Sequence, residues 1–145
     1  MDTGASGHVR GGSFKLHIGL IEALCESVKI TVELQTKMED GKTKLDHLIQ
    51  VEESTGRSHI PEVDVPAHGE HILTWFWSLS NARGSSGFGG PSPLSYTEIM
   101  AWKSLTKTKV YAWEIEALMT LDAAYMQAAS EISTSKNKQH SNSRK

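Results

Sequence analysis

Ile72-Leu-Thr-Trp-Phe-Trp-Ser-Leu-Ser80 opens the decisive stretch of this 145-residue chain, and Ala112-Trp-Glu-Ile-Glu-Ala-Leu-Met-Thr-Leu-Asp-Ala-Ala-Tyr125 closes it. All four tryptophans lie between residues 75 and 113, around one break rich in glycine and proline. Apolar residues recur every three or four positions in both segments, which is the spacing of a helix face. No acid, base or metal-binding groups converge there by spacing. The stretch therefore favours a helical protein that works by contact rather than by catalysis.

The first apolar segment predicts a helix over about residues 69–82, with Ile72, Phe76 and Leu79 on one side. Its other large apolar residues are Leu73, Trp75 and Trp77, and they widen the apolar arc. An arc this wide must be covered from more than one direction. The loop 83–93, with four glycines, ends the helix.

A strong helix start follows at residues 95–98. Ser95 can cap the helix, Glu98 can close a capping box, and Leu94 can pack on Ile99 as a hydrophobic staple. We expect a helix that ends near residue 105, with Ile99 and Trp102 facing inward. A longer helix over about residues 111–129 should carry most of the core along a stripe of Tyr111, Ile115, Leu118, Leu121 and Tyr125.

Upstream, Thr43 and Asp46 have capping-box spacing, which predicts a helix over residues 44–54 that stops at Gly56. Residues 20–26 predict a short helix, and the alternation over residues 28–34 predicts one short strand. Residues 1–13 are rich in glycine and serine, and residues 133–145 hold no apolar side chain, so both termini are predicted to be disordered. The predicted fold is mainly α, a small bundle of four to five helices.

Composition narrows the function. The net charge of -2 and pI of about 6.4 provide no overall basic field for nucleic acid or an anionic membrane. The single cysteine, Cys25, permits no internal disulfide and fits a reducing compartment. The apolar run 16–24 is too polar for a signal sequence or a membrane span. We expect a cytoplasmic protein.

The remaining site motifs are incomplete. Gly41-Lys42-Thr43 lacks the glycine that a phosphate loop needs at position 36, and the glycine loop 87–90 lacks a following lysine. His59, His68 and His71 could approach one another, but no carboxylate or cysteine completes a metal site with them at a convincing spacing. Asp122 is either solvated at the edge of the stripe or hydrogen-bonded to a neighbouring helix end. We expect no catalytic residue, no metal and no cofactor.

A DNA-binding alternative comes from the helices at 95–105 and 111–129, whose spacing is similar to a helix-turn-helix. The second of these helices opens with Trp113, Glu114 and Glu116, and its two carboxylates would repel phosphate. A small DNA-binding regulator therefore remains the alternative function.

The runs 72–80, 91–102 and 112–125 together resemble the tail assembly chaperones of long-tailed bacteriophages and prophages. The segments 40–48 and 55–57 are also similar to the start of such proteins, so the resemblance covers about residues 38–127. It implies a non-enzymatic helical protein of the host cytoplasm, absent from the finished virion. Such a protein coats the tape measure protein and keeps it soluble while tail tube subunits polymerise around it. The tail tube protein and a second copy of the chain are further candidate partners.

The resemblance also divides the chain. Residues 1–37 are expected to be a partly disordered N-terminal extension, residues 38–131 a helical chaperone domain, and residues 132–145 a disordered tail. We expect a chain that begins at Met38 to fold without the extension. Large aromatic residues dominate contact energies where they are exposed, so they are the candidate partner contacts. These candidates are Trp75, Trp77, Phe88, Trp102 and Trp113. The alternative that each of them fills the core of the monomer stays open.

Overall fold

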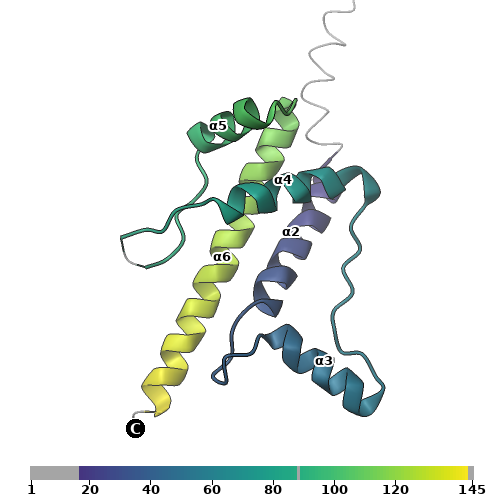
Figure 1. Ribbon diagram of the computed structural model, residues 1–145, viewed down its shortest axis with the longest axis vertical. Helices are drawn as coiled ribbons and strands as arrows, with labels where there is room; N and C mark the ends of the chain where they lie inside the picture. The colour runs from purple at the N-terminus through teal and green to yellow at the C-terminus, as the bar shows by residue number, and fades with distance from the viewer. Residues whose placement is uncertain (1–16, 88, 144–145) are drawn as a thin grey trace, which may run out of the picture.

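The computed structural model describes residues 17–87 and 89–143, and helices form most of this part of the chain (Figure 1). A 3-10 turn at Ala67–Gly69 leads into the third helix. The described residues contain no strand, only two isolated bridges. The prediction of a small, mainly α bundle is confirmed. The helices are α2 (Ile18–Leu34), α3 (Lys44–Thr55), α4 (Glu70–Asn81), α5 (Tyr96–Thr106) and α6 (Ala112–Ser143).

Helices α2 and α6 run side by side in the same direction (Figure 1) and form the centre of the core. The His17 ring stacks on Trp113 at 3.7 Å, and the Cys25 thiol lies 3.9 Å from the Thr120 carbonyl oxygen. Alanines on α6 let the two helices approach closely, because the distance between two packed helix axes decreases with the size of the side chains between them. The buried apolar residues of the two helices are Leu20, Ile21, Leu24 and Val28 of α2, and Ala117, Leu118, Leu121, Ala124 and Ala128 of α6.

Helix α4 crosses this pair and closes the core from one side (Figure 1). It buries Ile72, Phe76 and Leu79, the three residues that the helical spacing assigned to its inner face. At its start the backbone comes very close to α2, since a Cβ placed on Gly69 would lie 2.5 Å from Cδ1 of Leu20. The glycine at this position lets α4 cross α2 in contact.

The predicted strand over residues 28–34 is wrong, because these residues continue α2 as one helix from Ile18 to Leu34. The buried positions Leu20, Leu24 and Val28 follow one another every four residues and belong to the hydrophobic core, and α2 packs along α6. Burial against a partner helix outweighs the weak strand preference of alternating β-branched residues, which had no second strand to pair with.

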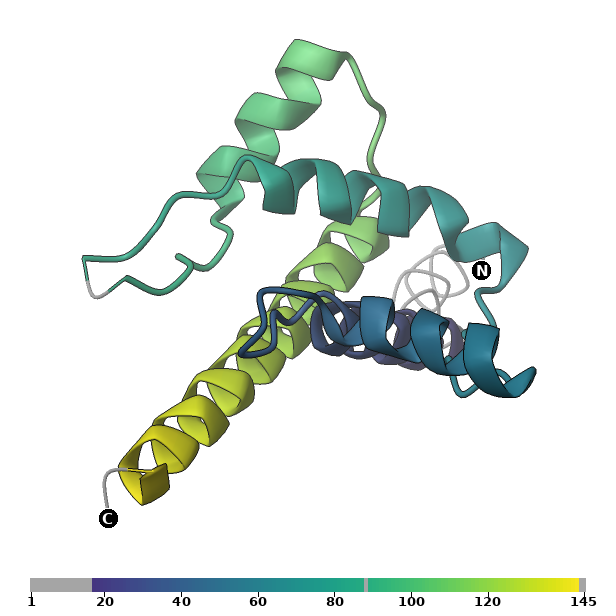
Figure 2. The ribbon, with the colours of Figure 1, turned by 60° about the horizontal axis from the view of Figure 1, so that its bottom comes forward.

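Helix α3 lies below α2 in Figure 1 and in front of it in Figure 2. Its predicted start is confirmed: Thr43 Oγ1 accepts the Asp46 N–H at 3.1 Å, and Asp46 Oδ2 accepts the Thr43 N–H at 2.9 Å. Gly56 ends it in the left-handed conformation at φ 73°. None of its side chains is fully buried. Local capping therefore fixes α3 more than packing does.

Helix α6 is longer than predicted, because it continues to Ser143 instead of ending near residue 129. The expected disorder is thus wrong for residues 133–143. No proline or glycine interrupts this segment, and extending an existing helix avoids the cost of nucleation. The expectation of disorder at residues 1–13 lies outside the described residues. The boundary at Met38 stays a prediction, although α2 supplies four side chains to the core.

Candidate partner-binding surface

Helix α5 begins at the predicted capping box. Ser95 Oγ accepts the Glu98 N–H at 3.2 Å, and Glu98 Oε2 accepts the Ser95 N–H at 2.9 Å. Leu94 and Ile99 are both buried, as expected of the residues that flank this start. The helix ends at Lys107, whose φ of 55° is left-handed. Its position is therefore fixed mainly at its first turn.

Most of α5 lies on the surface, and Ile99 is its only fully buried residue. Three large apolar side chains of the helix are exposed: Tyr96 by 66%, Met100 by 68% and Leu105 by 84%. Large apolar residues that gather on one exposed element commonly mark a contact surface. Among the described helices, α5 therefore carries the most exposed large apolar side chains.

A groove of about 310 Å³ lies between α4 and α5. Its walls are mainly apolar, and Leu79, Trp102 and Leu105 contribute the largest side chains. Polar groups from Ser78 and Glu98 also border it. An apolar floor with a polar border is the usual form of a site for an amphipathic helix.

A buried ion pair holds the loop between α4 and α5 against α6. Arg83 Nη2 donates to Asp122 Oδ1 at 2.6 Å, and both side chains are only 5% exposed. Arg83 also donates to the Ser92 carbonyl at 2.9 Å and to Ser80 Oγ at 3.1 Å. Its guanidinium lies 4.1 Å from the centre of the Tyr125 ring. The contacts of Arg83 thus join both ends of the loop to α6.

Asp122 takes the second of its two predicted environments. Its Oδ2 accepts the backbone N–H of Leu94 at 2.9 Å, immediately before the start of α5. One buried carboxylate therefore binds both Arg83 and the beginning of α5. Within the described part of the chain, no buried side-chain nitrogen or oxygen lacks a hydrogen-bond partner.

The tryptophans proposed as partner contacts are all partly buried and pack against the core. Trp75 and Trp102 meet edge to face at 5.7 Å and join α4 to α5. Trp77 packs on Tyr125 of α6, and Trp113 packs on His17 near the start of α2. The structure thus brings Trp75 and Trp102 together, and places Trp77 and Trp113 elsewhere. Phe88 lies outside the described residues, and partner contact by these five residues stays a prediction.

Polar groups elsewhere have structural partners. His71 Nε2 lies 2.6 Å from Glu114 Oε2, and Glu114 Oε1 accepts the Tyr111 N–H at 2.8 Å at the start of α6. Burial raises the pKa of the Cys25 thiol, which keeps it protonated and poorly nucleophilic. In residues 17–87 and 89–143, no group of three or more histidines, cysteines or carboxylates could hold a metal ion.

The pair α5 and α6 does not have the exposure that a DNA-reading helix needs. Glu114 is buried in the first turn of α6, and Leu118 and Leu121 face the core. A recognition helix must instead present its first turns to the major groove. This arrangement argues against the DNA-binding alternative.

Sequence reasoning missed Tyr96, Met100 and Leu105. The sequence did contain the information needed to predict that these residues are exposed. The capping box predicts where α5 begins, and the inward residues Ile99 and Trp102 define which side of α5 faces the core. At 100° per residue, Met100 and Leu105 then fall on opposite flanks of the helix, away from the core. The tryptophans were expected at the contact surface because large aromatic side chains dominate contact energies, but the fold partly buries all four of them.

The family model described as phage tail assembly chaperone matches residues 55–127, which is half of the chain. The match includes α4, α5, the loop between them and the first half of α6. No curated protein and no solved structure matches the chain. Among the described helices, none has both the length and the apolar character needed to cross a bilayer.

Proposed function

The chain belongs to the phage tail assembly chaperone family, and we propose that it binds the tape measure protein of its phage and keeps it soluble during tail assembly. The proposal assigns the groove between α4 and α5 as the binding site. Both helices lie inside the segment that matches the family, whereas α2 and α3 lie largely or wholly before it.

The observation that carries the proposal is the exposed apolar lining of this groove. Leu105 is 84% exposed at its border, although water contact of a leucine is unfavourable. A partner that covers Leu105 removes this apolar surface from water. Trp102, which lines the groove, also contacts Trp75 of α4, and this contact joins α4 to α5 without a partner.

The groove suits an amphipathic helix. Such a helix places apolar residues at positions i, i+3, i+4 and i+7, and this ridge can lie between α4 and α5. Ser78 and Glu98 at the border can then meet polar residues on the flanks of the bound helix. A long, mainly helical tape measure protein offers many such ridges, so one chaperone could bind repeated segments.

The proposal includes three further elements. The protein acts in the host cytoplasm, it carries out no reaction, and it is released before the virion is complete. The tail tube protein is a second candidate partner, because tube subunits would replace the chaperone along the tape measure protein.

The test is co-expression with the long helical protein encoded just downstream, followed by pull-down and sizing of the complex. The expected result is co-purification, with the partner soluble only in the presence of the chaperone. Leu105→Ser should weaken binding by about 2 kcal/mol, close to thirtyfold in Kd, because it removes an apolar contact at the groove. Ala101→Gln should weaken binding by filling the groove.

Met100→Ser is the matched control. Met100 is a large, exposed apolar residue of the same helix, but it does not line the groove. If Met100→Ser weakens binding as much as Leu105→Ser, the groove is not the site. If the downstream protein stays insoluble and fails to co-purify, the proposed function itself is wrong.

A further inference from the structure

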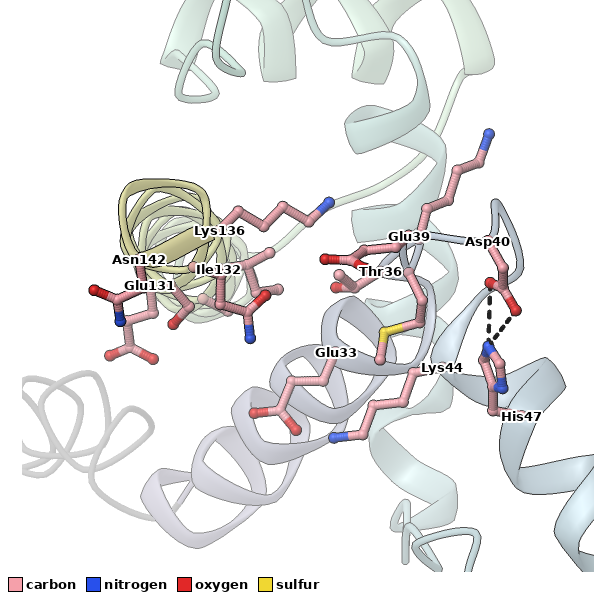
Figure 3. Close-up of a pocket in the computed structure, with 15 residues that line it drawn as sticks. Glu33, Thr36, Glu39, Asp40, Lys44, His47, Glu131, Ile132, Lys136 and Asn142 are labelled. Carbon is pink, nitrogen blue, oxygen red and sulfur yellow. Dashed lines mark hydrogen bonds and ion pairs between the residues drawn. The ribbon is translucent and has the colours of Figure 1, made fainter. Parts of the chain in front are cut away.

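Two hollows of this protein differ in the charges that line them. An open cleft of about 1240 Å³ lies between α6 and the end of α2, the turn after it and the start of α3 (Figure 3). Figure 3 shows Glu33 and Lys44 on one side of it and Glu131 and Lys136 on the other, so its charges favour no single kind of occupant. The groove between α4 and α5 is different, because Glu98 is the only charged residue among those that line it.

Glu98 uses one carboxylate oxygen in the capping box and keeps the other available. Its Oε2 accepts the Ser95 N–H at 2.9 Å. Within residues 17–87 and 89–143, no lysine, arginine or histidine forms an ion pair with Glu98, and its side chain is exposed. Both oxygens of a carboxylate accept hydrogen bonds. Oε1 can therefore accept a hydrogen bond from a cation of a bound segment without disturbing the start of α5.

Basic side chains of this chain do not neutralise the Glu98 carboxylate. Arg83 follows α4, but its guanidinium is bound to Asp122 and only 5% exposed. Lys103 comes five positions after Glu98, which places it about 140° round α5 and away from the groove. Lys107 lies roughly 13 Å farther along the helix axis, beyond the distance at which exposed charges interact strongly in physiological salt.

The two helix ends near Glu98 carry opposite partial charges. The end of α4 lies beside the start of α5, because the Ser92 N–H donates to the Gly84 carbonyl at 3.0 Å across the loop. A helix N-terminus carries about +0.5 of an elementary charge, and a C-terminus about −0.5. These two contributions offset each other here. The full charge of Glu98 therefore makes this end of the groove negative.

The geometry of α5 also fixes where a complementary cation must lie. Glu98, Ala101 and Leu105 line the groove at positions i, i+3 and i+7 of the helix. The axis rises about 10 Å from Glu98 to Leu105, which is two turns. A bound helix that lies along α5 and covers Leu105 with an apolar residue thus brings a residue about seven positions away beside Glu98. A lysine or arginine there is attracted, and an acidic residue there is repelled.

We propose that Glu98 is the specificity-determining residue of the groove. It selects amphipathic segments that carry a lysine or arginine about two helical turns from the apolar residue that covers Leu105. Segments with the same apolar ridge but an acidic residue at this position bind more weakly, because specificity also comes from repulsion of the wrong partner. The inference rests on the proposed function, and it states which segments of a long tape measure helix the groove binds.

The test uses two fluorescein-labelled peptides that are held helical by a hydrocarbon staple and share one ridge of leucines. One carries arginine seven positions from the last leucine, and the other carries citrulline there, which has nearly the same shape without the charge. Fluorescence anisotropy measures their Kd values for the full chain and for Glu98→Gln. Glutamine also serves at this position of a capping box, so the variant keeps the start of α5.

The wild type should bind the arginine peptide about fivefold more tightly than the citrulline peptide at low salt. Glu98→Gln should bind both peptides equally, and added salt should reduce the preference of the wild type. Glu116→Gln is the matched control. It removes an exposed carboxylate of α6 that does not line the groove, so it should keep the preference. A loss of affinity for both peptides alike in Glu98→Gln would indicate a structural role and would overturn the inference.

Leu105→Ser separates this inference from the assignment of the groove, because it should weaken both peptides. If it does so while Glu98→Gln keeps the preference for arginine, the inference is wrong and the groove remains the site. If Leu105→Ser changes neither Kd, or if neither peptide binds the wild type, the groove is not the site and the inference fails with it. Co-expression with the downstream protein then decides separately whether the chain acts as its chaperone.

Discussion

Replacing Arg83 by methionine should destabilise this protein strongly. The change removes the 2.6 Å contact to Asp122 and leaves that carboxylate with the Leu94 N–H. Because both side chains of the pair are only 5% exposed, water cannot take the place of the guanidinium. Removing one partner of a buried ion pair costs about 3–5 kcal/mol. That loss is a large part of a typical folding stability of roughly 5–15 kcal/mol.

A second substitution separates the charge from the packing. Adding Asp122→Asn to Arg83→Met removes the unpaired charge, while the amide oxygen can still accept the Leu94 N–H. The double variant should therefore recover about 2 kcal/mol relative to Arg83→Met. Urea unfolding followed by tryptophan fluorescence measures all three free energies of unfolding, since Trp75 and Trp102 lie at the junction of α4 and α5.

Two results would refute this reasoning. A loss below about 1 kcal/mol for Arg83→Met would mean that the pair does not hold the loop against α6. A double variant that is less stable than Arg83→Met would mean that packing around Arg83, and not the unpaired carboxylate, sets the cost.

Three further predictions concern helix ends and the N-terminal helix. Lys107→Gly should raise the free energy of unfolding by about 0.5–1 kcal/mol in chemical denaturation, because glycine adopts a φ of 55° without strain. The hydrogen bond from the Thr43 N–H lowers the pKa of the Asp46 carboxyl below its usual value of 3.8. The Asp46 carboxylate therefore supports α3 above pH 3.8, and this support is lost as the pH falls through the lowered pKa. Asp46→Asn should remove this acid-dependent loss of helicity, as measured by circular dichroism. Unlike the resemblance, the structure predicts that a chain beginning at Met38 lacks stable helical structure by the same method, because it loses the four core residues of α2; a cooperative unfolding transition would show the opposite.

Helix starts could be predicted from the sequence because their signals are local. The capping boxes at Thr43 and Ser95 need only residues three positions apart, and both have the expected hydrogen bonds. The inner face of α4 was also predictable, since Ile72, Phe76 and Leu79 recur at helical spacing. These features depend on contacts within one helix or on one apolar face.

Features that depend on distant residues were not predictable in the same way. Residues 28–34 alternate like a strand, and their helical partner lies about 95 residues later in the chain. The partial burial of Trp77 depends on Tyr125, and the ion pair of Asp122 depends on Arg83. Only the fold brings these residues together, so sequence spacing alone could not assign them.

The central claim is that the tape measure protein lies in the groove between α4 and α5. Site-specific photo-crosslinking tests it most directly, with a benzophenone amino acid at position 105 and, as the control, at position 100. During co-expression, position 105 should crosslink to the downstream helical protein, and mass spectrometry should locate the crosslink in an amphipathic segment. Position 100 should give little product. Equal crosslinking at both positions, or none at position 105 in a complex that co-purifies, would contradict the account.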